Sequence, residues 1–528
     1  MKIRFSSADR QQIEALGITA ARVSEQVKIF QKADFFVRLD RPCTLGDGVR
    51  RIKDEEAPRY LALHSRAASS GRFMKFVPAS GAATRMFQSL LQIYYLPQYL
   101  ERDELEKRVS QGVAIACDFV RFVKDLDRFA FTGILREALA RDGFDLEELV
   151  QSSRYRTILE YLLTERGLAY GTLPKALLQF HSYPDGTRTA FEEQLVESVE
   201  FLQAENSGCK LHFTIPEDHE AGFSAHIEQV RRCYRERYCT EFDIRFSHQK
   251  PSTNTIAVNM DGHPFRDRFG RLHFRPAGHG ALLENLHDLE ADLVYIKNID
   301  NVVPDRLKEP VSYWKKILGG FLVDIQERVH SLVARLRREE PQAVSDAADY
   351  AARELLVRFP DDFASRPEQK KRQFLLDRLD RPIRVCGVVP NSGEPGGAPF
   401  WVEDSSGSVC IQIVEKAQVN MEFQDQQKIW NSSTHFNPVD IVCCTRNFEG
   451  KPFDLHKYVD PGAVIITKKS KDGQDIQALE LPGLWNGSMA YWVSVFVEVP
   501  PDTFNPVKSV YDLLRPEHQP EMPPVMRG

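Results

Sequence analysis

A loop of small residues followed by an arginine is the first feature of this chain suited to phosphate chemistry. The apolar run over residues 72–78 leads into Ala79-Ser80-Gly81-Ala82-Ala83-Thr84 and then Arg85, after which a helical pattern begins. Such a loop lets backbone N–H groups approach phosphate oxygens, and Arg85 could hold a phosphate through two hydrogen bonds. The loop fits neither a Walker loop nor a G-x-G-x-x-G fingerprint, so a plain strand–helix turn is the competing interpretation.

A lysine with a restrained backbone is the second feature. Lys175 follows Pro174 in the stretch GTLPKALLQFHSY. The proline would hold the backbone extended and fix the direction of the amine, which suits a phosphate contact. A lysine before an apolar run is also commonly a surface residue whose stem covers its neighbours, and that alternative stays open.

Two further positions suit ligand binding. Glycines flank His279 in the stretch PAGHG, which is typical of a loop pressed against a planar ligand. Asp300 ends the apolar run that begins at residue 293, at the strand end where open α/β sheets bind ligands. Because Mg²⁺ prefers oxygen ligands, Asp300 is a candidate metal ligand. A hydrogen-bonded loop histidine and a turn-capping aspartate before Asn301 are the competing interpretations.

The elements that must position these residues alternate in type. Strand-like runs over residues 211–215, 242–246 and 293–299 alternate with helical patterns over residues 189–204, 223–237 and 281–289. This alternation predicts βα units and a largely parallel sheet.

Outside residues 189–299 the predicted secondary structure changes several times along the chain. We expect a helical N-terminal segment over residues 1–72 and, over residues 95–170, a helical insertion without strands. Packing is the favoured role of the insertion, and closure over a substrate is the alternative. A charged helical connection over residues 311–380 leads to strands over residues 383–515, and residues 516–528 form a tail that we expect to be disordered.

Composition limits the classes of protein. The 528 residues carry 69 Lys+Arg against 75 Asp+Glu, a net charge of -6, which argues against a nucleic-acid-binding protein. No apolar run approaches the ~20 residues of a membrane helix. Nine scattered cysteines indicate reduced thiols and a cytoplasmic protein rather than a disulfide framework. Cys209-x-x-His212 lacks the partners that would complete a zinc site.

Blocks along the chain resemble those of eukaryotic-type UDP-sugar pyrophosphorylases. In order, these blocks are the loop before Arg85, Pro174-Lys175, QKPST at 249–253, PAGHG at 276–280, NIDN at 298–301, Gly396-Gly397 with IQIVEKAQV at 411–419, THFNPVDIV at 434–442 and TFNPVKSVYDLL at 503–514. That group includes UTP–glucose-1-phosphate uridylyltransferases and UDP-N-acetylhexosamine pyrophosphorylases. The whole chain also resembles an uncharacterised bacterial family, domain of unknown function 4301, with the same blocks.

The resemblance implies an α/β, GT-A-like nucleotide-diphospho-sugar transferase fold with a mixed, mostly parallel central sheet, and a nucleotidyltransferase-like domain over residues 73–515. The nucleotide-binding residues that it implies are Ala79, Ser80, Gly81, Ala82, Thr84, Gln249, Gly278 and His279. It implies that Arg85, Lys175 and Lys508 are catalytic, and that Asp300 holds Mg²⁺. Gly397, Glu415 and Asn437 match sugar contacts.

The implied reaction joins a nucleoside triphosphate, with UTP favoured, to a sugar 1-phosphate and releases pyrophosphate. It needs no protein nucleophile, only positioning and neutralisation of charge. The chain departs from the family where Ser80 to Thr84 replace G-G-x-G-T and where Val439 and Asp440 replace asparagines. A non-catalytic nucleotide-sugar-binding or regulatory protein of the same fold is therefore the main alternative, and a glycosyltransferase of that fold is a third.

Overall fold

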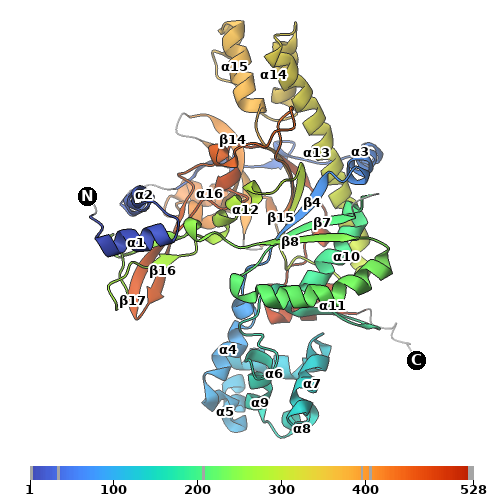
Figure 1. The fold of residues 1–528 in the computed structure, drawn as a ribbon, viewed down its shortest axis with the longest axis vertical. Coiled ribbons are helices and arrows are strands. Elements are labelled where there is room, and N and C mark those ends of the chain that lie inside the picture. Colours follow the sequence, from blue (N-terminus) through green and yellow to red (C-terminus); the bar gives the residue numbers. More distant parts are fainter. Residues whose placement is uncertain (1–3, 32–35, 205–207, 394–395, 404–406, 521–528) are drawn as a thin grey trace.

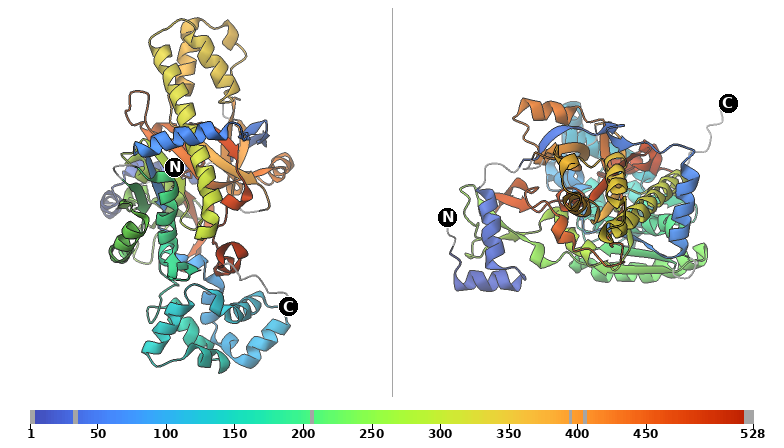
Figure 2. Two further views of the ribbon diagram at one scale, coloured as in Figure 1. Left: turned by 90° about the vertical axis from the view of Figure 1, so that its right-hand side faces the viewer. Right: turned by 90° about the horizontal axis from the view of Figure 1, so that it is seen from above.

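A central sheet with a helical lobe at each end makes up the protein (Figures 1 and 2). The computed structural model describes residues 4–31, 36–204, 208–393, 396–403 and 407–520. Within these ranges no helix is both long and apolar enough to cross a membrane.

The central sheet is mixed but mostly parallel, which confirms the predicted fold class. Among the described residues it has nine strands, in the order β2 (Thr44–Leu45), β3 (Gly48–Arg50), β18 (Val493–Glu498), β12 (Ile383–Pro390), β15 (His435–Cys444), β11 (Leu293–Lys297), β4 (Phe73–Pro78), β7 (Cys209–Thr214) and β8 (Phe242–Ser247). β15 is antiparallel to both of its neighbours, whereas the other neighbouring pairs are parallel. The parallel strands β4, β7, β8 and β11 therefore end at one edge.

Smaller sheets flank the central one. Their strand orders are β1 (Arg38–Pro42), β13 (Gly397–Glu403), β14 (Val409–Glu415); β10 (Phe274–Arg275), β9 (Thr255–Asn259), β17 (Gln474–Glu480), β16 (Ile465–Lys471); and β5 (Gln179–Tyr183), β6 (Gly186–Thr189). The sheet with β16 and β17 lies beside the first two helices (Figure 1).

Helices α10 (Ala190–Leu202), α11 (Glu220–Tyr238) and α12 (Leu283–His287) fall where the βα alternation predicts helices. In chain order the bounds of the other helices are α1 (Ser7–Ala15), α2 (Ala20–Phe30), α3 (Ala57–Ser69), α4 (Gln88–Tyr94), α5 (Arg102–Ser110), α6 (Ala114–Lys124), α7 (Thr132–Arg141), α8 (Leu146–Gln151), α9 (Tyr155–Leu163), α13 (Lys308–Arg337), α14 (Ala343–Arg353), α15 (Glu368–Leu379) and α16 (Gln424–Asn431). α13 packs closely on α3, because a Cβ at Gly320 would lie 1.8 Å from the Tyr60 carbonyl oxygen.

Side chains on the central strands alternate between two apolar cores. On β4, Phe73 and Val77 join the cluster that includes residues of α3, α10 and α13. Met74 and Phe76 point to the other face, into the cluster that contains residues of α12. The period of two thus buries both faces of β4, as expected for a central parallel strand.

The segment over residues 95–170 contains helices and turns and no strand. α4 to α9 form the lobe at the lower end of Figure 1. The lobe has its own aromatic core, in which Phe119, Phe122, Phe129 and Phe131 are buried. Whether it packs or also closes over a ligand stays a prediction.

Both ends of the chain differ from the expected structure. Residues 38–50 were expected in a helical segment but form β1, β2 and β3, because β1 pairs with β13 and β3 with β18, far along the chain. In the expected disordered tail, Pro516–His518 forms a 3₁₀ helix and His518 is buried. Residues 521–528 lie outside the described residues.

Candidate functional site

A cleft of about 700 Å³ opens at the edge where the parallel strands end. Its lining comes from loops that follow β4, β8, β10 and β11, together with the Pro-Lys segment and the loop before β18. These lining residues are Pro78, Ser80, Gly81, Ala82, Thr84, Arg85, Lys175, Gln249, Pro276, Gly278, His279, Leu282, Asn298, Ile299, Asp300 and Trp485. Open α/β sheets bind ligands at this edge, so the cleft is the candidate site.

The loop over residues 79–85 and the Pro-Lys segment are held together through their backbones. The Ala83 N–H donates to the Leu173 carbonyl oxygen at 3.0 Å, and the Lys175 N–H donates to the Gly81 carbonyl oxygen at 3.2 Å. Two blocks that are distant in sequence therefore form one wall of the cleft.

Donors on this wall are left without protein partners. The backbone N–H groups of Ser80, Gly81 and Ala82 donate to no residue that the structure describes, and neither does the exposed Arg85 guanidinium. Unpaired backbone donors beside a free guanidinium can bind a phosphate. The small residues of the loop keep that backbone accessible, as the sequence predicts.

Lys175 and Asp300 meet on the adjoining wall. The Lys175 Nζ lies 2.8 Å from the Asp300 Oδ2 and donates to the Val507 carbonyl oxygen at 2.9 Å. Their side chains are 15% and 19% exposed, so both remain accessible from the cleft. The ion pair was not predicted, although the sequence analysis chose each residue.

The loop that carries Asp300 is fixed from two sides. The Gln194 Nε2 of α10 donates to the Asn298 carbonyl oxygen at 3.0 Å. On the other side the Val507 N–H donates to the Asp300 carbonyl oxygen at 3.0 Å. The C-terminal P-V-K segment is thereby attached next to Asp300.

An aromatic pair forms the opposite part of the cleft. The His279 ring stacks on Trp485 with centroids 4.1 Å apart and planes at 14°. The Leu484 N–H donates to the His279 Nδ1 at 3.0 Å, which leaves the proton of a neutral ring on Nε2. That nitrogen then donates to the Glu415 Oε1 at 3.1 Å, so the orientation of the ring is fixed on three sides.

The glycines beside His279 are required by the local geometry. Gly278 has a φ of +74°, and a Cβ there would lie 2.8 Å from the Glu480 Oε2. A Cβ at Gly280 would lie 2.3 Å from the Pro482 carbonyl oxygen. Gln249 lines the cleft near this loop, and its Nε2 donates to the Thr253 Oγ1 at 3.4 Å.

Other predicted nucleotide and phosphate residues lie beside the cleft. Ala79 is buried, and its N–H donates to the Thr214 carbonyl oxygen at 2.9 Å, so it anchors the loop. Lys508 is exposed with its Nζ 5.7 Å from the Phe504 ring centroid, and it is not among the residues that line the cleft.

The predicted sugar residues also lie outside the lining. Gly397 pairs with Glu415 across β13 and β14, and Glu415 reaches the cleft only through His279. Asn437 is buried in β15, where its Nδ2 donates to the Gly387 carbonyl oxygen at 2.9 Å. Their roles as sugar contacts stay predictions.

Trp485 is the lining residue that the sequence analysis missed most clearly. The sequence does contain a signal for it, because Trp485 is an aromatic residue between two glycines in the stretch PGLWNG, as His279 is in PAGHG. Pro78, Leu282, Asn298 and Ile299 were missed as well.

The site has one feature that fits Mg²⁺. Asp300 is the acidic residue among the described lining residues, and its Oδ1 makes no hydrogen bond with a described residue. Mg²⁺ is commonly held by one or two carboxylates together with substrate phosphates, so the donor set is compatible. The Lys175 amine on Oδ2 would then share the carboxylate with the cation.

A family model described as a domain of unknown function (DUF4301) matches residues 6–519. No curated protein matches the sequence. Among solved structures, the chain is similar to the UDP-glucose pyrophosphorylase of Leishmania major, with a TM-score of 0.44 and 12% identity over 97% of this chain and 79% of that chain.

Two structures from Trypanosoma brucei are similar to a comparable extent. For a UDP-glucose phosphorylase the TM-score is 0.44 at 14% identity, covering 96% of this chain and 77% of that chain. For a uridine diphosphate N-acetylglucosamine pyrophosphorylase in complex with an inhibitor it is 0.45 at 12% identity, covering 97% and 82%.

Proposed function

We propose that this chain, which belongs to the DUF4301 family, is a nucleotidyltransferase that forms a nucleotide sugar from UTP and a sugar 1-phosphate. The observation that carries the proposal is the convergence of two cations, one carboxylate and an aromatic pair on a single cleft. Arg85, Lys175 and Asp300 lie on its phosphate side, and His279 with Trp485 on the other.

The division of the cleft suggests how a nucleoside triphosphate would bind. Loop amides from Ser80 to Ala82 and the Arg85 guanidinium would hold the phosphates, because they have no partner to give up among the described residues. Gln249 and the loop at Gly278 would contact the base, beside the rigid stack of His279 on Trp485. UTP is favoured by the resemblance of these blocks.

The proposed reaction is an in-line displacement. An oxygen of the sugar 1-phosphate attacks the α-phosphorus, a new P–O bond forms, and the bond from the α-phosphorus to the bridging oxygen breaks. Pyrophosphate leaves with that oxygen and its electron pair. Arg85 and Lys175 would neutralise the charge that accumulates on the phosphate oxygens, and fixed cations contribute most when they are already in position.

Mg²⁺ bound by Asp300 would supply further neutralisation of the phosphates. The Lys175 amine has three N–H groups, and the one that neither Asp300 nor Val507 accepts would be free to donate to a phosphate oxygen. The Val507 carbonyl, which already accepts from the Lys175 Nζ, would keep the amine at the cleft.

A non-catalytic nucleotide-sugar-binding protein is the second candidate. The Lys175–Asp300 ion pair favours it, because two groups assigned to phosphate and metal neutralise each other here. The position of Lys508 outside the cleft lining points the same way. Such a protein would bind the nucleotide sugar and release no pyrophosphate.

One screen tests both candidates. The full chain is incubated with Mg²⁺, one of the four common nucleoside triphosphates and each of a panel of sugar 1-phosphates, and pyrophosphate and nucleotide sugar are measured. We expect both products with UTP, and their loss in Lys175→Met but not in Lys124→Met, an exposed lysine of the distant α6. Binding of a nucleotide sugar with no pyrophosphate from any combination would favour the second candidate.

A further inference from the structure

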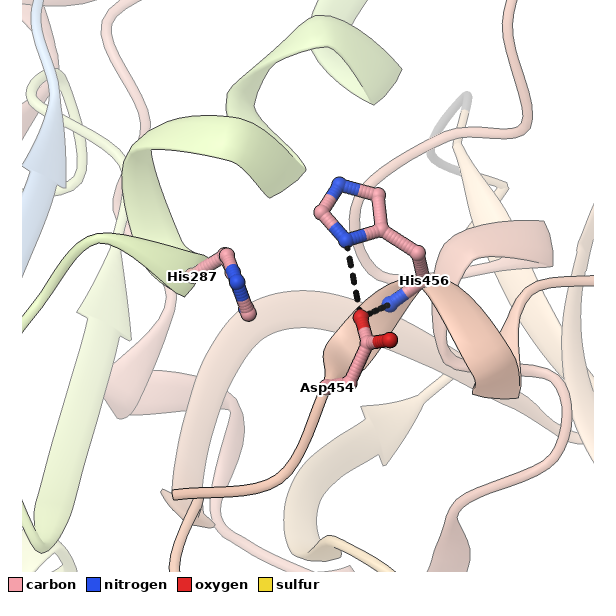
Figure 3. Close-up of side chains that lie close together, drawn as sticks. All are labelled: His287, Asp454 and His456. Atoms are coloured by element: carbon pink, nitrogen blue, oxygen red, sulfur yellow. Dashed lines mark hydrogen bonds and ion pairs between the residues drawn. The ribbon is translucent and has the colours of Figure 1, made fainter.

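A second cluster of ligand-type side chains lies outside the cleft, between α12 and the 3₁₀ helix Leu455–Tyr458. His287 ends α12, while Asp454 and His456 lie at the start of the 3₁₀ helix. One ligand atom from each of the three lies within 4.8 Å of the others. Figure 3 shows His287 facing the Asp454–His456 pair.

His456 is held between two carboxylates. Its Nδ1 lies 3.1 Å from the Asp454 Oδ1, and its Nε2 lies 2.9 Å from the Glu284 Oε1. Glu284 and His287 are three residues apart on α12, so they share one face of that helix. The cluster therefore has two imidazoles and two carboxylates from two segments far apart in sequence.

His287 differs from the others because it has no polar partner. Its ring centroid lies 4.8 Å from that of His456 at 71°, yet its nitrogens make no hydrogen bond or ion pair with a described residue. Its Nδ1 is also inaccessible to solvent. An unpartnered imidazole beside a histidine–aspartate pair is unexplained by an ion-pair cluster, which would be complete without it.

We propose that His287, Asp454 and His456 bind a divalent transition metal ion of the zinc class, with Glu284 orienting His456. The set of two imidazoles and one carboxylate is one that Zn²⁺ accepts, and a tetrahedral ion would keep a fourth position for water. Two ligands at ~2.1 Å from a tetrahedral ion lie about 3.4 Å apart, close to the 3.1 Å between the His456 Nδ1 and the Asp454 Oδ1.

In this arrangement the His456 Nε2–H donates to Glu284. A ligating histidine commonly donates its second N–H to a carboxylate, which fixes the tautomer and the ring. To complete the site, His287 must turn a ring nitrogen toward the pair and move closer, since its ligand atom lies within 4.8 Å of the other two.

A metal bound at the end of α12 would affect the cleft, because α12 contacts a segment that leads into the cleft lining. The Asn285 Nδ2 on α12 donates to the Ser247 Oγ at 2.8 Å and to the His248 carbonyl oxygen at 2.9 Å. Both residues immediately precede Gln249. A metal that joins α12 to residues 454–456 would therefore stiffen the support of the loop that carries Gln249. The metal site itself does not depend on the proposed function.

The test is metal binding by the full chain after treatment with a chelator. Titration with Zn²⁺ is followed by calorimetry, and Co²⁺, which gives a visible spectrum characteristic of its geometry, replaces it in a second titration. We expect one site that weakens about 100-fold or more in His287→Gln and in His456→Gln. Glu284→Gln should cost roughly 10- to 100-fold, as loss of a partner that orients a ligand does.

His263→Gln is the matched control, because His263 is exposed and its side chain has no partner among the described residues. This variant should bind Zn²⁺ like the wild type. Thermal unfolding without metal checks that each variant folds, and added Zn²⁺ should raise the midpoint of the wild type and of His263→Gln more than that of the other variants. Absence of stoichiometric binding by the wild type, or wild-type affinity in either His287→Gln or His456→Gln, would overturn the proposal.

Discussion

Two groups of charged residues lie close together in this protein but differ in what surrounds them. The cleft presents Arg85 and the Lys175–Asp300 pair at the edge of the sheet, where solvent reaches them. Behind it, between the sheet and helices α10 and α13, a buried network includes Lys75, Glu197 and Lys297. Lys297 lies only three residues before Asp300.

The buried network satisfies its charges internally. The Lys75 Nζ lies 2.6 Å from the Glu197 Oε2, and the Lys297 Nζ donates to the other Glu197 oxygen. Beside them, the Lys315 Nζ lies 2.5 Å from the Asp440 Oδ1. All five side chains are at most 5% exposed.

Burial has a measurable electrostatic consequence in this network. It lowers the pKa of Lys75 to about 8 and that of Lys297 to about 7, although Glu197 acts in the opposite direction on both. A search guided by perturbed pKa values alone would therefore select these lysines as the active site. The comparison teaches that a perturbed pKa marks a buried charge, whereas a ligand needs a charge that is both fixed and accessible.

The largest expected effect is a loss of stability when a partner is removed from the buried network. Glu197→Ala leaves Lys75 and Lys297 without their carboxylate, and removing one partner of a buried pair typically costs about 3–5 kcal/mol. We expect that loss in the free energy of unfolding, measured with urea. Glu200→Ala, an exposed site on the same helix, should change it by less than about 0.5 kcal/mol. Equal effects of the two variants would mean that the network contributes no special stability.

The next largest effect is a loss of turnover when the Asp300 carboxylate of the cleft is replaced. Asp300→Asn preserves size but removes the charge that would hold Mg²⁺, so turnover should fall roughly 10²- to 10³-fold, about 3–4 kcal/mol. The melting temperature should change little, because the amide can still accept from Lys175 in this partly exposed position. Pyrophosphate release and thermal unfolding are measured on the same preparation. Unchanged turnover at saturating Mg²⁺ would show that Asp300 does not hold the metal.

A buried histidine, His64, should contribute to the pH dependence of stability. Burial lowers the pKa of His64, which stacks on Phe73 of β4, from 6.5 to about 3. Between these two pH values, the unfolded chain therefore binds a proton at His64 that the folded chain does not bind. His64 contributes full stability above pH 6.5, and this contribution is lost progressively as the pH falls from there toward 3, by up to about 1.4 kcal/mol per pH unit.

Urea unfolding at pH 6 and pH 5 checks this expectation. His64→Leu removes the titrating group, so its stability should fall less steeply between the two values than that of the wild type. The same slope in both proteins would contradict a neutral, buried His64. Since the Leu variant also changes packing, the slope and not the absolute stability is the quantity compared.

The smallest effect is a loss of stability in the loop at Gly278, which lines the cleft. Gly278→Ala places a side chain at a φ of +74° with its Cβ 2.8 Å from the Glu480 carboxylate, so the free energy of unfolding should fall by ~1 kcal/mol or more. Gly46→Ala is the control, because its φ is +82° but nothing lies within 4 Å of the added Cβ. If the two variants lose the same stability, the contact with Glu480 has no effect.

Elements stabilised by local patterns were predicted well, and elements that depend on distant partners were not. The βα alternation from residue 189 to residue 299 has a local hydrophobic signal, and the structure has strands and helices there. β3 and the docked His518 have no such signal, since β18 and His181 hold them from hundreds of residues away.

The candidate site was predicted in the same uneven way. Arg85, Lys175, Gln249, His279 and Asp300 line one cleft, as the order of their blocks indicates. The pairing of Lys175 with Asp300 and the stacking of Trp485 depend on three-dimensional contacts that spacing does not contain. Lys75 and Lys297 were overlooked because each stands inside an apolar run, although a lysine in such a run is itself a signal of buried pairing.

Calorimetric titration with UTP and Mg²⁺ tests the central claim, that the accessible charges of the cleft bind a uridine nucleotide. The wild type should bind UTP or a UDP-sugar more tightly than the other nucleotides. Arg85→Ala, which removes a guanidinium that contacts no polar group of the described residues, should lose most of this affinity while its melting temperature stays unchanged. Binding of another nucleotide in place of both uridine ligands, or undiminished UTP affinity in Arg85→Ala, would contradict the account.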